Sequence, residues 1–515
     1  MTVRLVAHIF LDIDLKCRLG AILEMIQNLG EALQESCIKH ANRMALSSIH
    51  GDFTYLNLLS AAKGLAEKLK TLGVGLNEPV HVLVSNQPTD IAAILAIWLS
   101  GGVIVPIHRS SPLEVHRKIQ QKSHANHLVD FVTFDKAPKI TRIGSSNKQF
   151  DQLLDDAAFV IFTSGSTGEP KGVVVSHQSF QGKLIEIDRL LKFNQSDRVL
   201  LVLNINFVFG LWTVLETLLH GGTLYLHEKF DPEIFVSTLT EKEITRVGVV
   251  PTMMRVIFSK SELVEQIRSK VNTGTLQQIL IGGESLGRSL ALMVRKEFSK
   301  SNLIDIYGST ETASCDFFSF PENFSEFPGC IGKPSGGVKY RIVNEFDIPV
   351  ERGVEGSLQI DSPYLMKGYL GDPELTKAAF SGEWFKTGDI AKEVAPSVLE
   401  LMGRSKDLIS RGGNKVTPGE IEQAICAHPS VAAAMAVGIP DALLGERIHM
   451  LIVLNSMKSL NKEEIKDHLG LRLEKYKLPD VFYFGDALPT GKTGKADRTQ
   501  LRDQILNGLL IPEFI

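Results

Sequence analysis

The chain has 515 residues, a formal net charge of −4 at pH 7 and 44% hydrophobic residues. A chain of this length exceeds what a single hydrophobic core organises, so we expect two or more domains. The small net charge argues against nucleic acid or an acidic membrane surface as the main partner. Five cysteines without paired spacing fit a reducing compartment and predict no zinc site.

No stretch of the sequence predicts a membrane span. The N-terminal residues are apolar, but charged side chains such as Asp12, Asp14 and Lys16 interrupt the core that a signal peptide needs. The longest uncharged stretch, residues 91–107, contains glycines and a proline, which predict a buried helix, a turn and a buried strand. We therefore expect a cytoplasmic protein.

Strand-like apolar runs alternate with segments of helical spacing from residue 55 to residue 306. This alternation predicts an α/β fold with a mostly parallel sheet that is covered by helices on both faces. The predicted segments are helices 55–72 and 90–99, strands 80–84 and 102–106, and mixed segments 199–226, 246–257 and 276–306.

The pattern changes twice in the second half of the chain. Short alternating strands separated by Gly and Pro at 339–366 predict a small β-rich subdomain. From about Arg404 onward, helices and strands alternate again in a run that predicts a compact α+β domain. The polar segment 403–407 is the expected boundary, so the predicted domains are 1–403 and 404–515.

Residues 163–172 form a loop rich in Gly, Ser and Thr that follows the strand-like run 158–162. Glycines let backbone N–H groups turn toward an anion, hydroxyls add donors, and Lys171 adds a positive charge. The spacing differs from the P-loop, because no Ser or Thr follows Lys171. A flexible surface loop is the alternative. The predicted phosphate-binding residues are Thr163, Ser164, Gly165, Ser166, Thr167, Gly168 and Lys171.

A second motif comprises residues 305–311. Tyr307 beside Gly308 offers a flat face to a purine, and the Thr310 hydroxyl and Glu311 carboxylate can meet phosphate and magnesium. An ordinary turn before a helix with an acidic first turn is the alternative. The turn 282–285 lies upstream, and its paired glycines allow close approach of a planar ring, although it is also compatible with a plain helix-capping turn.

Three further motifs follow. In residues 382–389, Asp389 at a tight turn can accept both hydroxyls of a ribose. Residues 403–407 contain Arg404 and Lys406, which could simply form a cluster of charged side chains in solvent. Near the C-terminus, residues 488–498 contain two lysines, Lys492 and Lys495, each of which follows a glycine, and a basic solvated tail is one interpretation of this segment.

These motifs, in this order between residues 163 and 498, resemble the adenylate-forming superfamily of acyl-CoA synthetases, luciferases and adenylation domains of peptide synthetases. The resemblance implies that the loop at 163–172 binds the phosphates of ATP. It further implies that Asp305 contacts the base, Tyr307 stacks on it, Thr310 touches phosphate and Glu311 binds Mg²⁺. The residues that it places beside adenine and the acyl group are Gly282, Gly283, Glu284, Ser285 and Gly308.

The resemblance also covers the C-terminal part of the chain. It implies that Asp389 and Arg404 hold the ribose and that Lys406 is the hinge of a mobile C-terminal domain. The family spacing selects Lys495, with Arg498 three residues later, over Lys492 as the catalytic lysine. A loop of Arg411, Gly412 and Gly413 resembles the Gly-rich loop that lines a pantetheine tunnel in CoA ligases.

The implied reaction is attack of a carboxylate on the α-phosphate of ATP, with Mg²⁺ and Lys495 neutralising the developing charge. The resulting acyl-AMP then reacts with a thiol. The implied cofactors are ATP, Mg²⁺ and coenzyme A or phosphopantetheine, and the implied partners are a small carboxylic acid and CoA or an acyl carrier protein. The sequence does not decide whether the protein forms a homodimer.

The predicted acyl pocket departs from the family pattern. Many CoA ligases have P-L-x-H-x-x-G in this segment, whereas residues 204–210 lack the proline and place Phe207 at the histidine position. An aspartate that would pair with an amino-acid substrate is missing as well. The segment therefore favours an apolar acid, unless its phenylalanines are simply core. The predicted pocket residues are Phe207, Gly210, Gly282 and Gly308.

Three functions remain open at this point. The first is an acid–CoA ligase, which the loop at 411–413 favours. The second is a ligase that loads an acyl group onto the phosphopantetheine of a carrier protein. The third is a catalytically silent nucleotide-binding protein, and the joint presence of Glu311, Asp389, Arg404 and Lys495 argues against it.

Overall fold

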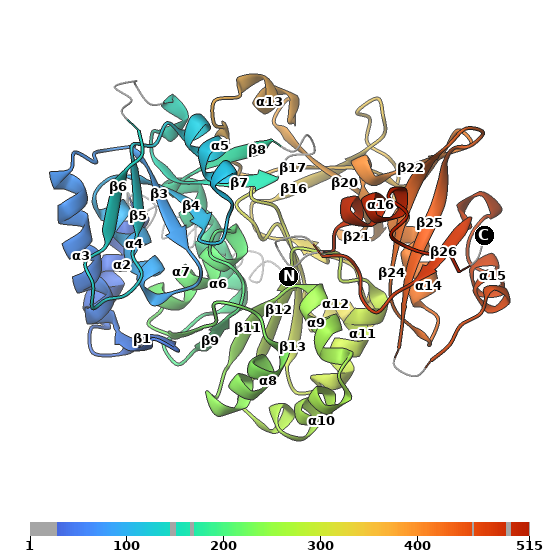
Figure 1. Ribbon diagram of the computed structural model, residues 1–515, viewed down its shortest axis with the longest axis horizontal. Helices are drawn as coiled ribbons and strands as arrows, with labels where there is room; N and C mark the ends of the chain where they lie inside the picture. Colours follow the sequence, from blue (N-terminus) through green and yellow to red (C-terminus); the bar gives the residue numbers. More distant parts are fainter. Residues whose placement is uncertain (1–27, 145–150, 165–168, 456–457, 491–495, 514–515) are drawn as a thin grey trace, which may run out of the picture. The chain divides into compact units, whose positions relative to one another are not determined.

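The computed structural model describes residues 28–144, 151–164, 169–455, 458–490 and 496–513 (Figure 1). The chain folds into two compact units. The first contains the described residues up to Lys229 together with Ser309–Ser314 and Pro363–Ala378. The second contains Phe230–Gly308, Cys315–Ser362 and the described residues from Ala379 onward. The predicted domain boundary near residue 404 lies inside the second unit and stays a prediction.

The first unit is built around a seven-stranded sheet in the order β18-β8-β7-β4-β3-β5-β6. The strands β5, β3, β4 and β7 are parallel, whereas β6, β8 and β18 pair antiparallel at the two edges. The strands are β3 (Pro79–Val84), β4 (Val103–His108), β5 (His127–Asp130), β6 (Lys139–Arg142), β7 (Ala157–Ser164), β8 (Pro170–Ser176) and β18 (Gly368–Tyr369).

Four more strands of the first unit pair in the order β9-β10-β1-β2, with only β2 antiparallel to its neighbour. These are β1 (Met44–Ser48), β2 (Gly51–Thr54), β9 (Arg198–Leu201) and β10 (Thr223–Leu226). The helices of this unit are α2 (Leu29–Lys39), α3 (Tyr55–Thr71), α4 (Pro88–Leu99), α5 (Leu113–Ser123), α6 (His177–Leu191), α7 (Val208–Leu219) and α13 (Pro373–Ala378). Because α4 and α7 consist mostly of apolar residues, they are almost completely buried.

The second unit begins with alternating helices and parallel strands, and it places three strands in the order β13-β12-β11. The strands are β11 (Arg246–Val249), β12 (Gln278–Gly282) and β13 (Asn302–Tyr307), extended by antiparallel β14 (Phe317–Ser319) and β15 (Lys333–Pro334). The helices are α8 (Pro232–Glu241), α9 (Pro251–Phe258), α10 (Ser261–Ser269), α11 (Arg288–Glu297) and α12 (Pro321–Glu326). Ligands of open α/β sheets bind beyond the carboxyl ends of such strands, where 282–285 and 307–308 lie.

The small β-rich subdomain forms an antiparallel sheet in the order β16-β17-β20-β19, with β21 paired to β20. Its strands are β16 (Lys339–Val343), β17 (Gly356–Asp361), β19 (Phe380–Ser381), β20 (Trp384–Ala395) and β21 (Val398–Arg404). This sheet explains why the sequence changes at 339–366 to short strands separated by Gly and Pro. Strands in which buried and exposed residues alternate are typical of antiparallel sheets.

The C-terminal residues form a sheet of their own, in which β26 is parallel to β25 and the other pairs are antiparallel. Its elements are β22 (Ile409–Arg411), β23 (Asn414–Val416), β24 (Val431–Asp441), β25 (Gly445–Leu454), β26 (Val481–Phe484), α14 (Pro418–Cys426), α15 (Lys462–Gly470) and α16 (Arg498–Leu506). Ile421, Ile448, Met450, Ile465 and Phe482 belong to one buried apolar cluster of this sheet and its helices. This part of the chain thus has its own core.

The predicted α/β fold with a smaller α+β portion is confirmed, and the antiparallel edges of its sheets have a physical cause. Only a short loop joins β7 to β8, whereas a parallel connection needs a crossover of about a dozen residues or more. Where the sequence predicted a loop at 163–172, residues 163 and 164 lie in β7 and residues 170–172 lie in β8, and the two strands pair as a hairpin. None of the helices in the described ranges combines the length and the apolar character that crossing a membrane requires.

Gly332 is a position where the fold admits no side chain. Its φ is 82°, and a Cβ atom would lie 2.0 Å from the carbonyl oxygen of Phe318. We expect Gly332→Ala to lower the free energy of unfolding by about 3 kcal/mol or more. The matched control is Gly353→Ala, which has φ 87° but no atom within 4 Å of the added Cβ, so only conformational strain of about 1 kcal/mol applies. Equal losses of stability in urea unfolding would contradict the packing argument.

Candidate functional site

Three predicted site residues from distant segments of the second unit meet at the carboxyl end of β13. The Tyr307 hydroxyl donates a hydrogen bond of 2.6 Å to Oδ2 of Asp389. Arg404 Nε lies 3.2 Å from the other oxygen, Oδ1. The register of the β20–β21 hairpin, in which Asp389 pairs with Arg404, places the last two side by side. An aromatic ring, a carboxylate and a guanidinium are thus held together.

Hydrogen bonds also fix the backbone from which the Asp389 carboxylate projects. The Asp389 backbone N–H donates to Thr387 Oγ1 at 3.1 Å, and the Thr387 hydroxyl donates to the Leu358 carbonyl at 2.8 Å. Burial and the neighbouring Asp389 raise the pKa of the Tyr307 hydroxyl well above 10, so it stays protonated and donates. The Tyr307 ring meets Phe317 edge to face.

Asp305 precedes Tyr307 by two residues on the same strand, β13. Only 2% of Asp305 is exposed. Burial raises its pKa from 3.8 to about 8, so the carboxyl group is mostly neutral at pH 7. Its register partner on β14 is Ser319, whose buried hydroxyl has no hydrogen-bond partner within the described residues. This pair of small polar groups at the strand end suits a ligand that donates and accepts hydrogen bonds.

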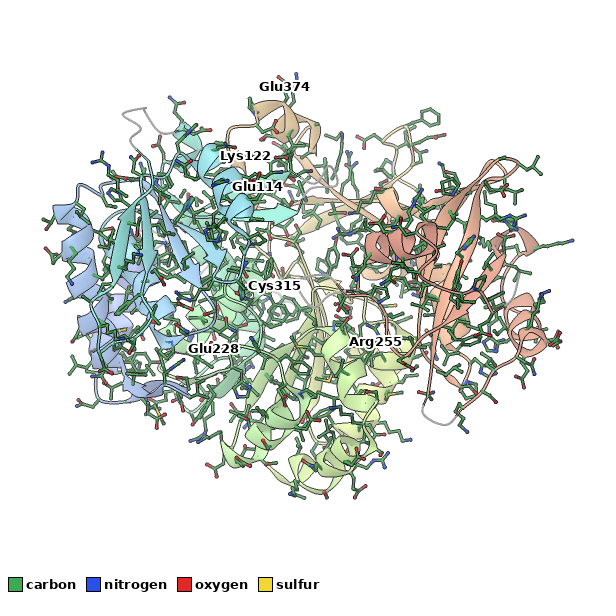
Figure 2. All side chains as sticks on the ribbon, in the orientation of Figure 1. Glu114, Lys122, Glu228, Arg255, Cys315 and Glu374 are labelled. Atoms are coloured by element: carbon green, nitrogen blue, oxygen red, sulfur yellow. The ribbon has the colours of Figure 1, made fainter. Side chains whose placement is uncertain are left out.

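The turn after β12 contains the predicted residues 282–285. Gly283 has φ 83°, which only glycine adopts readily. Glu284 faces α9, where the Thr252 hydroxyl donates to its two oxygens at 2.9 and 3.0 Å and Arg255 Nη1 lies 3.5 Å away (Figure 2 labels Arg255). Ser285 is exposed. The structure thus ties the Glu284 carboxylate to α9, a contact that the sequence did not predict.

Other predicted residues meet in the first unit. Thr163 and Lys171 are register partners in the β7–β8 hairpin, so they mark the two sides of the loop whose residues Gly165, Ser166, Thr167 and Gly168 lie outside the described part of the chain. Lys171 Nζ lies 5.6 Å from the ring centre of Tyr369, and the Tyr369 hydroxyl donates to Glu311 Oε1 at 3.1 Å. Tyr369 was not predicted, because its partner Glu311 lies 58 residues earlier and no local pattern marks the pair.

The turn that contains Thr310 and Glu311 ends in an unusual backbone conformation. Ala313, Ser314 and Cys315 have φ values of 55°, 73° and 56° (Figure 2 labels Cys315). Non-glycine residues in this left-handed region cost about 1–3 kcal/mol each and are retained mainly at functional sites. The Ser314 backbone N–H donates to the Ser309 carbonyl at 2.8 Å and closes the turn around Thr310 and Glu311.

The predicted acyl-pocket residues of the first unit lie at the start of α7. Phe207 is the N-terminal capping residue of that helix, and its side chain is half-buried. Gly210 lies in the first helical turn, where a Cβ atom would approach the Asn204 carbonyl oxygen to 2.5 Å. Close backbone packing alone therefore requires glycine at position 210. Gly282 and Gly308 lie in the second unit, at the carboxyl ends of β12 and β13.

The predicted C-terminal residues lie around β22 and α16. Lys406 is exposed in a single 3₁₀ turn. Gly412 and Gly413, at φ 58° and 83°, form the two-residue turn between β22 and β23. Arg411 pairs with Asp480 and donates to the Tyr476 carbonyl at 2.6 Å, which fixes it within the C-terminal sheet.

Both candidate catalytic lysines, Lys492 and Lys495, lie outside the described residues. The two ends of the loop that contains them are held together by a β-bridge between Thr490 and Ala496. Arg498, the first residue of α16, pairs with Glu422 at 2.8 Å. The local structure on both sides of these lysines is thus well defined.

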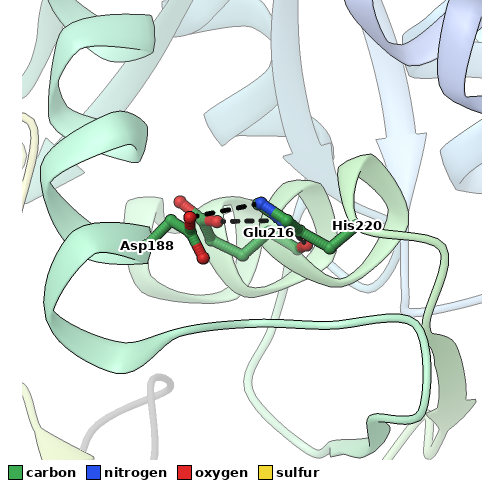
Figure 3. Close-up of side chains that lie close together, drawn as sticks. All are labelled: Asp188, Glu216 and His220. Atoms are coloured by element: carbon green, nitrogen blue, oxygen red, sulfur yellow. Dashed lines mark hydrogen bonds and ion pairs between the residues drawn. The ribbon is translucent and has the colours of Figure 1, made fainter.

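A cluster that the sequence did not predict joins two helices of the first unit. His220 Nε2 lies 3.4 Å from Asp188 of α6, and its Nδ1 lies 3.6 Å from Glu216 of α7 (Figure 3). Among the described residues this is the single group of His, Cys, Asp and Glu side chains close enough to share a metal ion. Its ion pairs join α6 to the end of α7.

Family models match most of the chain. A model described as AMP-binding enzyme matches residues 33–370, and one described as AMP-binding enzyme C-terminal domain matches residues 420–495. The chain is 29% identical to the 2-succinylbenzoate–CoA ligase of Bacillus licheniformis, with 89% of this chain and 96% of that protein covered. It is 28% identical to the feruloyl-CoA synthase of an Amycolatopsis species, with 87% and 93% covered.

Solved structures of o-succinylbenzoate-CoA synthetase from Bacillus subtilis are similar to the structure of this chain. One holds the acyl-adenylate intermediate, has a TM-score of 0.77 and covers 92% of this chain and 98% of that chain. Another, with ATP and a magnesium ion, also has a TM-score of 0.77 and covers 92% and 99%. Both are 26% identical to this chain.

The raised pKa of Asp305 predicts a pH dependence of stability. The folded protein binds this proton more tightly than the unfolded chain does, so the contribution of Asp305 to the free energy of unfolding is largest below pH 3.8 and falls as the pH rises toward about 8. The steepest possible slope for one group is about 1.4 kcal/mol per pH unit. We expect Asp305→Asn to flatten the decline that urea unfolding measures between about pH 5 and pH 8.

The matched control is Asp486→Asn, which replaces an exposed carboxylate and should leave the wild-type profile unchanged. Parallel pH profiles of Asp305→Asn and the wild type would show that Asp305 is not the group responsible.

Proposed function

The chain belongs to the AMP-binding enzyme family, and from that premise we propose that it activates an apolar aryl or acyl carboxylic acid with ATP and transfers the acyl group to coenzyme A. It is an AMP-forming acid–thiol ligase, like the CoA ligases to which it is similar along most of its length. The observation that carries the proposal is the convergence of Tyr307, Asp389 and Arg404. A flat ring beside a fixed carboxylate matches the base and the ribose of a nucleotide.

In the proposed nucleotide site, the adenine stacks on the face of Tyr307 beside Gly308. The neutral carboxyl group of Asp305 accepts a hydrogen bond from the exocyclic amine, and the turn of Gly282, Gly283, Glu284 and Ser285 borders the ring. Asp389 accepts the ribose hydroxyls, and the ion pair with Arg404 orients that carboxylate. The Thr252 and Arg255 contacts of Glu284 support a role in shaping this border.

The proposed triphosphate site combines the loop at 163–172 with Thr310 and Glu311. Backbone N–H groups and hydroxyls of the loop donate to phosphate oxygens, and Lys171 adds positive charge. Carboxylate and hydroxyl oxygens are the ligands that Mg²⁺ prefers, and the Tyr369 hydrogen bond uses only Oε1 of Glu311. The residues therefore fit this ion, which when bound neutralises phosphate charge.

The proposed chemistry proceeds in two steps. An oxygen of the substrate carboxylate attacks the α-phosphorus, the bond to the bridging oxygen breaks, and pyrophosphate leaves with that electron pair. Both reactants are anionic, so Lys495 stabilises the transition state by contacting the α-phosphate and acyl oxygens. In the second step the CoA sulfur attacks the acyl carbon, AMP leaves and the thiol proton passes to solvent.

The second step needs access for a thiol. We assign the hinge to Lys406, which is exposed in a short turn before β22, because hinges consist of a few loop or element-terminal residues that absorb large dihedral changes. The exposed Gly412–Gly413 turn then borders the pantetheine arm. Phe207, half-buried at the start of α7, supplies an aromatic wall for an apolar acid.

Pyrophosphate release with ATP and Mg²⁺ tests the function across short-chain, branched, long-chain and aromatic acids, with and without CoA. We expect release with apolar acids and formation of the corresponding CoA thioester, detected by mass spectrometry. Acid-dependent release without thioester would indicate a carrier protein as the acceptor. A protein that binds ATP in calorimetry but releases no pyrophosphate with any acid would contradict the proposed function.

Replacement of the two candidate lysines separates the two half-reactions. We expect Lys495→Ala to lower the rate of adenylation by about a hundredfold or more, because one charge aimed at the transition state is lost. Thioester formation from supplied acyl-AMP should be nearly unchanged. Lys492→Ala is the matched control in the same loop and should retain adenylation. Equal loss in both half-reactions of Lys495→Ala, or a larger loss in Lys492→Ala, would contradict the assignment.

A further inference from the structure

Tyr369 lies in β18, a two-residue strand at the edge of the seven-stranded sheet. Its register partner is Val173 on β8, and Gly368 pairs with Val174. Backbone hydrogen bonds continue the pairing on both sides, from Lys367 N–H to the Val174 carbonyl and from Leu370 N–H to the Gly172 carbonyl, each 2.8 Å. The backbone around Tyr369 is therefore fixed to the strand that contains Lys171.

The same short segment is also attached to the turn that contains Glu311. The Met366 N–H donates to the Glu311 carbonyl at 2.7 Å, and the Tyr369 hydroxyl donates to Glu311 Oε1 at 3.1 Å. The Tyr369 N–H is in turn bonded to Thr376 Oγ1 at 2.9 Å. Backbone and side chain thus hold Glu311 from one rigid segment.

The ring of Tyr369 has a second contact. Lys171 Nζ lies over its face at 5.6 Å from the centroid, within the range of a cation–π interaction. Only 5% of the residue is exposed, so the ring cannot turn away into solvent. One side chain therefore sets the separation between the lysine and the carboxylate that the proposed function places at the triphosphate.

We propose that Tyr369 is a positioning residue that orients the Glu311 carboxylate toward the magnesium ion of MgATP, an inference that rests on the proposed function. A carboxylate on a flexible side chain samples several orientations, and a hydrogen bond to one oxygen directs the other oxygen toward the metal. Groups that orient metal ligands in this way typically contribute about 10–100-fold to metal affinity. Burial and the neighbouring Glu311 raise the pKa of the Tyr369 hydroxyl above 10, so it donates throughout the neutral range.

The two contacts of Tyr369 can be removed one at a time. Tyr369→Phe keeps the ring under Lys171 and removes only the hydroxyl, whereas Tyr369→Leu removes both contacts. A residue that merely fills the core would respond to the loss of ring volume and hardly to the loss of the hydroxyl. The matched control is Tyr483→Phe, which removes a hydroxyl that contacts His449 at 2.9 Å in the C-terminal sheet.

The test measures metal binding without catalysis. Mn²⁺ replaces Mg²⁺ as a paramagnetic probe, and its dissociation constant is measured by electron paramagnetic resonance in the presence of α,β-methylene ATP. We expect Tyr369→Phe to raise this constant by about tenfold or more, and to leave metal-free binding of the analogue unchanged within about twofold. We expect Tyr369→Leu to weaken metal-free binding as well, because the Lys171 contact is lost.

A double-mutant cycle keeps the result independent of any loss of stability. In the Glu311→Gln background, the Tyr369→Phe change should have little further effect on the Mn²⁺ constant, since its target is already removed. Thermal unfolding of every variant monitors folding. An unchanged Mn²⁺ constant in Tyr369→Phe, an equal effect in the Glu311→Gln background or an equal effect of Tyr483→Phe would overturn the proposal.

Failure of this inference is distinguishable from failure of the proposed function. The wild-type protein could bind Mn²⁺ and the analogue tightly but release no pyrophosphate with any acid. That result would contradict the proposed function, and the Mn²⁺ dissociation constants of the variants would still test the role of Tyr369. Absence of metal–nucleotide binding by the wild-type protein would overturn the inference itself. In an active enzyme, Tyr369→Phe should shift the Mg²⁺ requirement of adenylation and leave thioester formation from supplied acyl-AMP unaffected.

Discussion

The first unit depends on the pairing of β8 with two antiparallel neighbours. Pairing with β7 brings Thr163 and Lys171 together as register partners at the base of the Gly-rich loop. Pairing with β18 brings Tyr369, and with it Glu311, to the other side of the same strand. A register slip of one residue would turn each of these side chains to the opposite face of the sheet. The hydrogen-bond ladder of β8 therefore determines which chemical groups meet.

Three carboxyl groups among the candidate site residues have different surroundings within their own units. Asp305 is kept mostly neutral by burial, which raises its pKa to about 8. Asp389 accepts a hydrogen bond from the Tyr307 hydroxyl and forms an ion pair with the Arg404 guanidinium. Glu311 accepts a hydrogen bond from the Tyr369 hydroxyl, and in the proposed function its carboxylate binds the metal. The three carboxyl groups are thus held by burial, by an ion pair and by a hydroxyl hydrogen bond, respectively.

Much of the candidate site was predictable because its motifs are local. Each motif is a short run in which neighbouring residues supply complementary chemistry. These runs are residues 163–172, the Tyr307–Glu311 segment, the run that ends at Asp389 and the run that contains Arg404. The contacts that were missed join segments distant in sequence: Glu284 bonds to Thr252, Arg411 pairs with Asp480, and Tyr369 bonds to Glu311. No periodicity or spacing encodes such pairs, since they arise only when sheets and helices pack.

The sequence by itself determined the alternation of strands and helices, the β-rich segment after residue 339 and the order of the nucleotide-binding motifs. These features depend on hydrophobic periodicity and on the local conformational preferences of Gly, Pro and polar residues, which act over a few positions. Only the tertiary structure decided that β7 and β8 pair as a hairpin, that three consecutive residues after Thr312 are left-handed, and that Tyr369 contacts both Lys171 and Glu311. Strand register and long-range packing decide these features, because they bring residues from different elements within a few ångströms of one another.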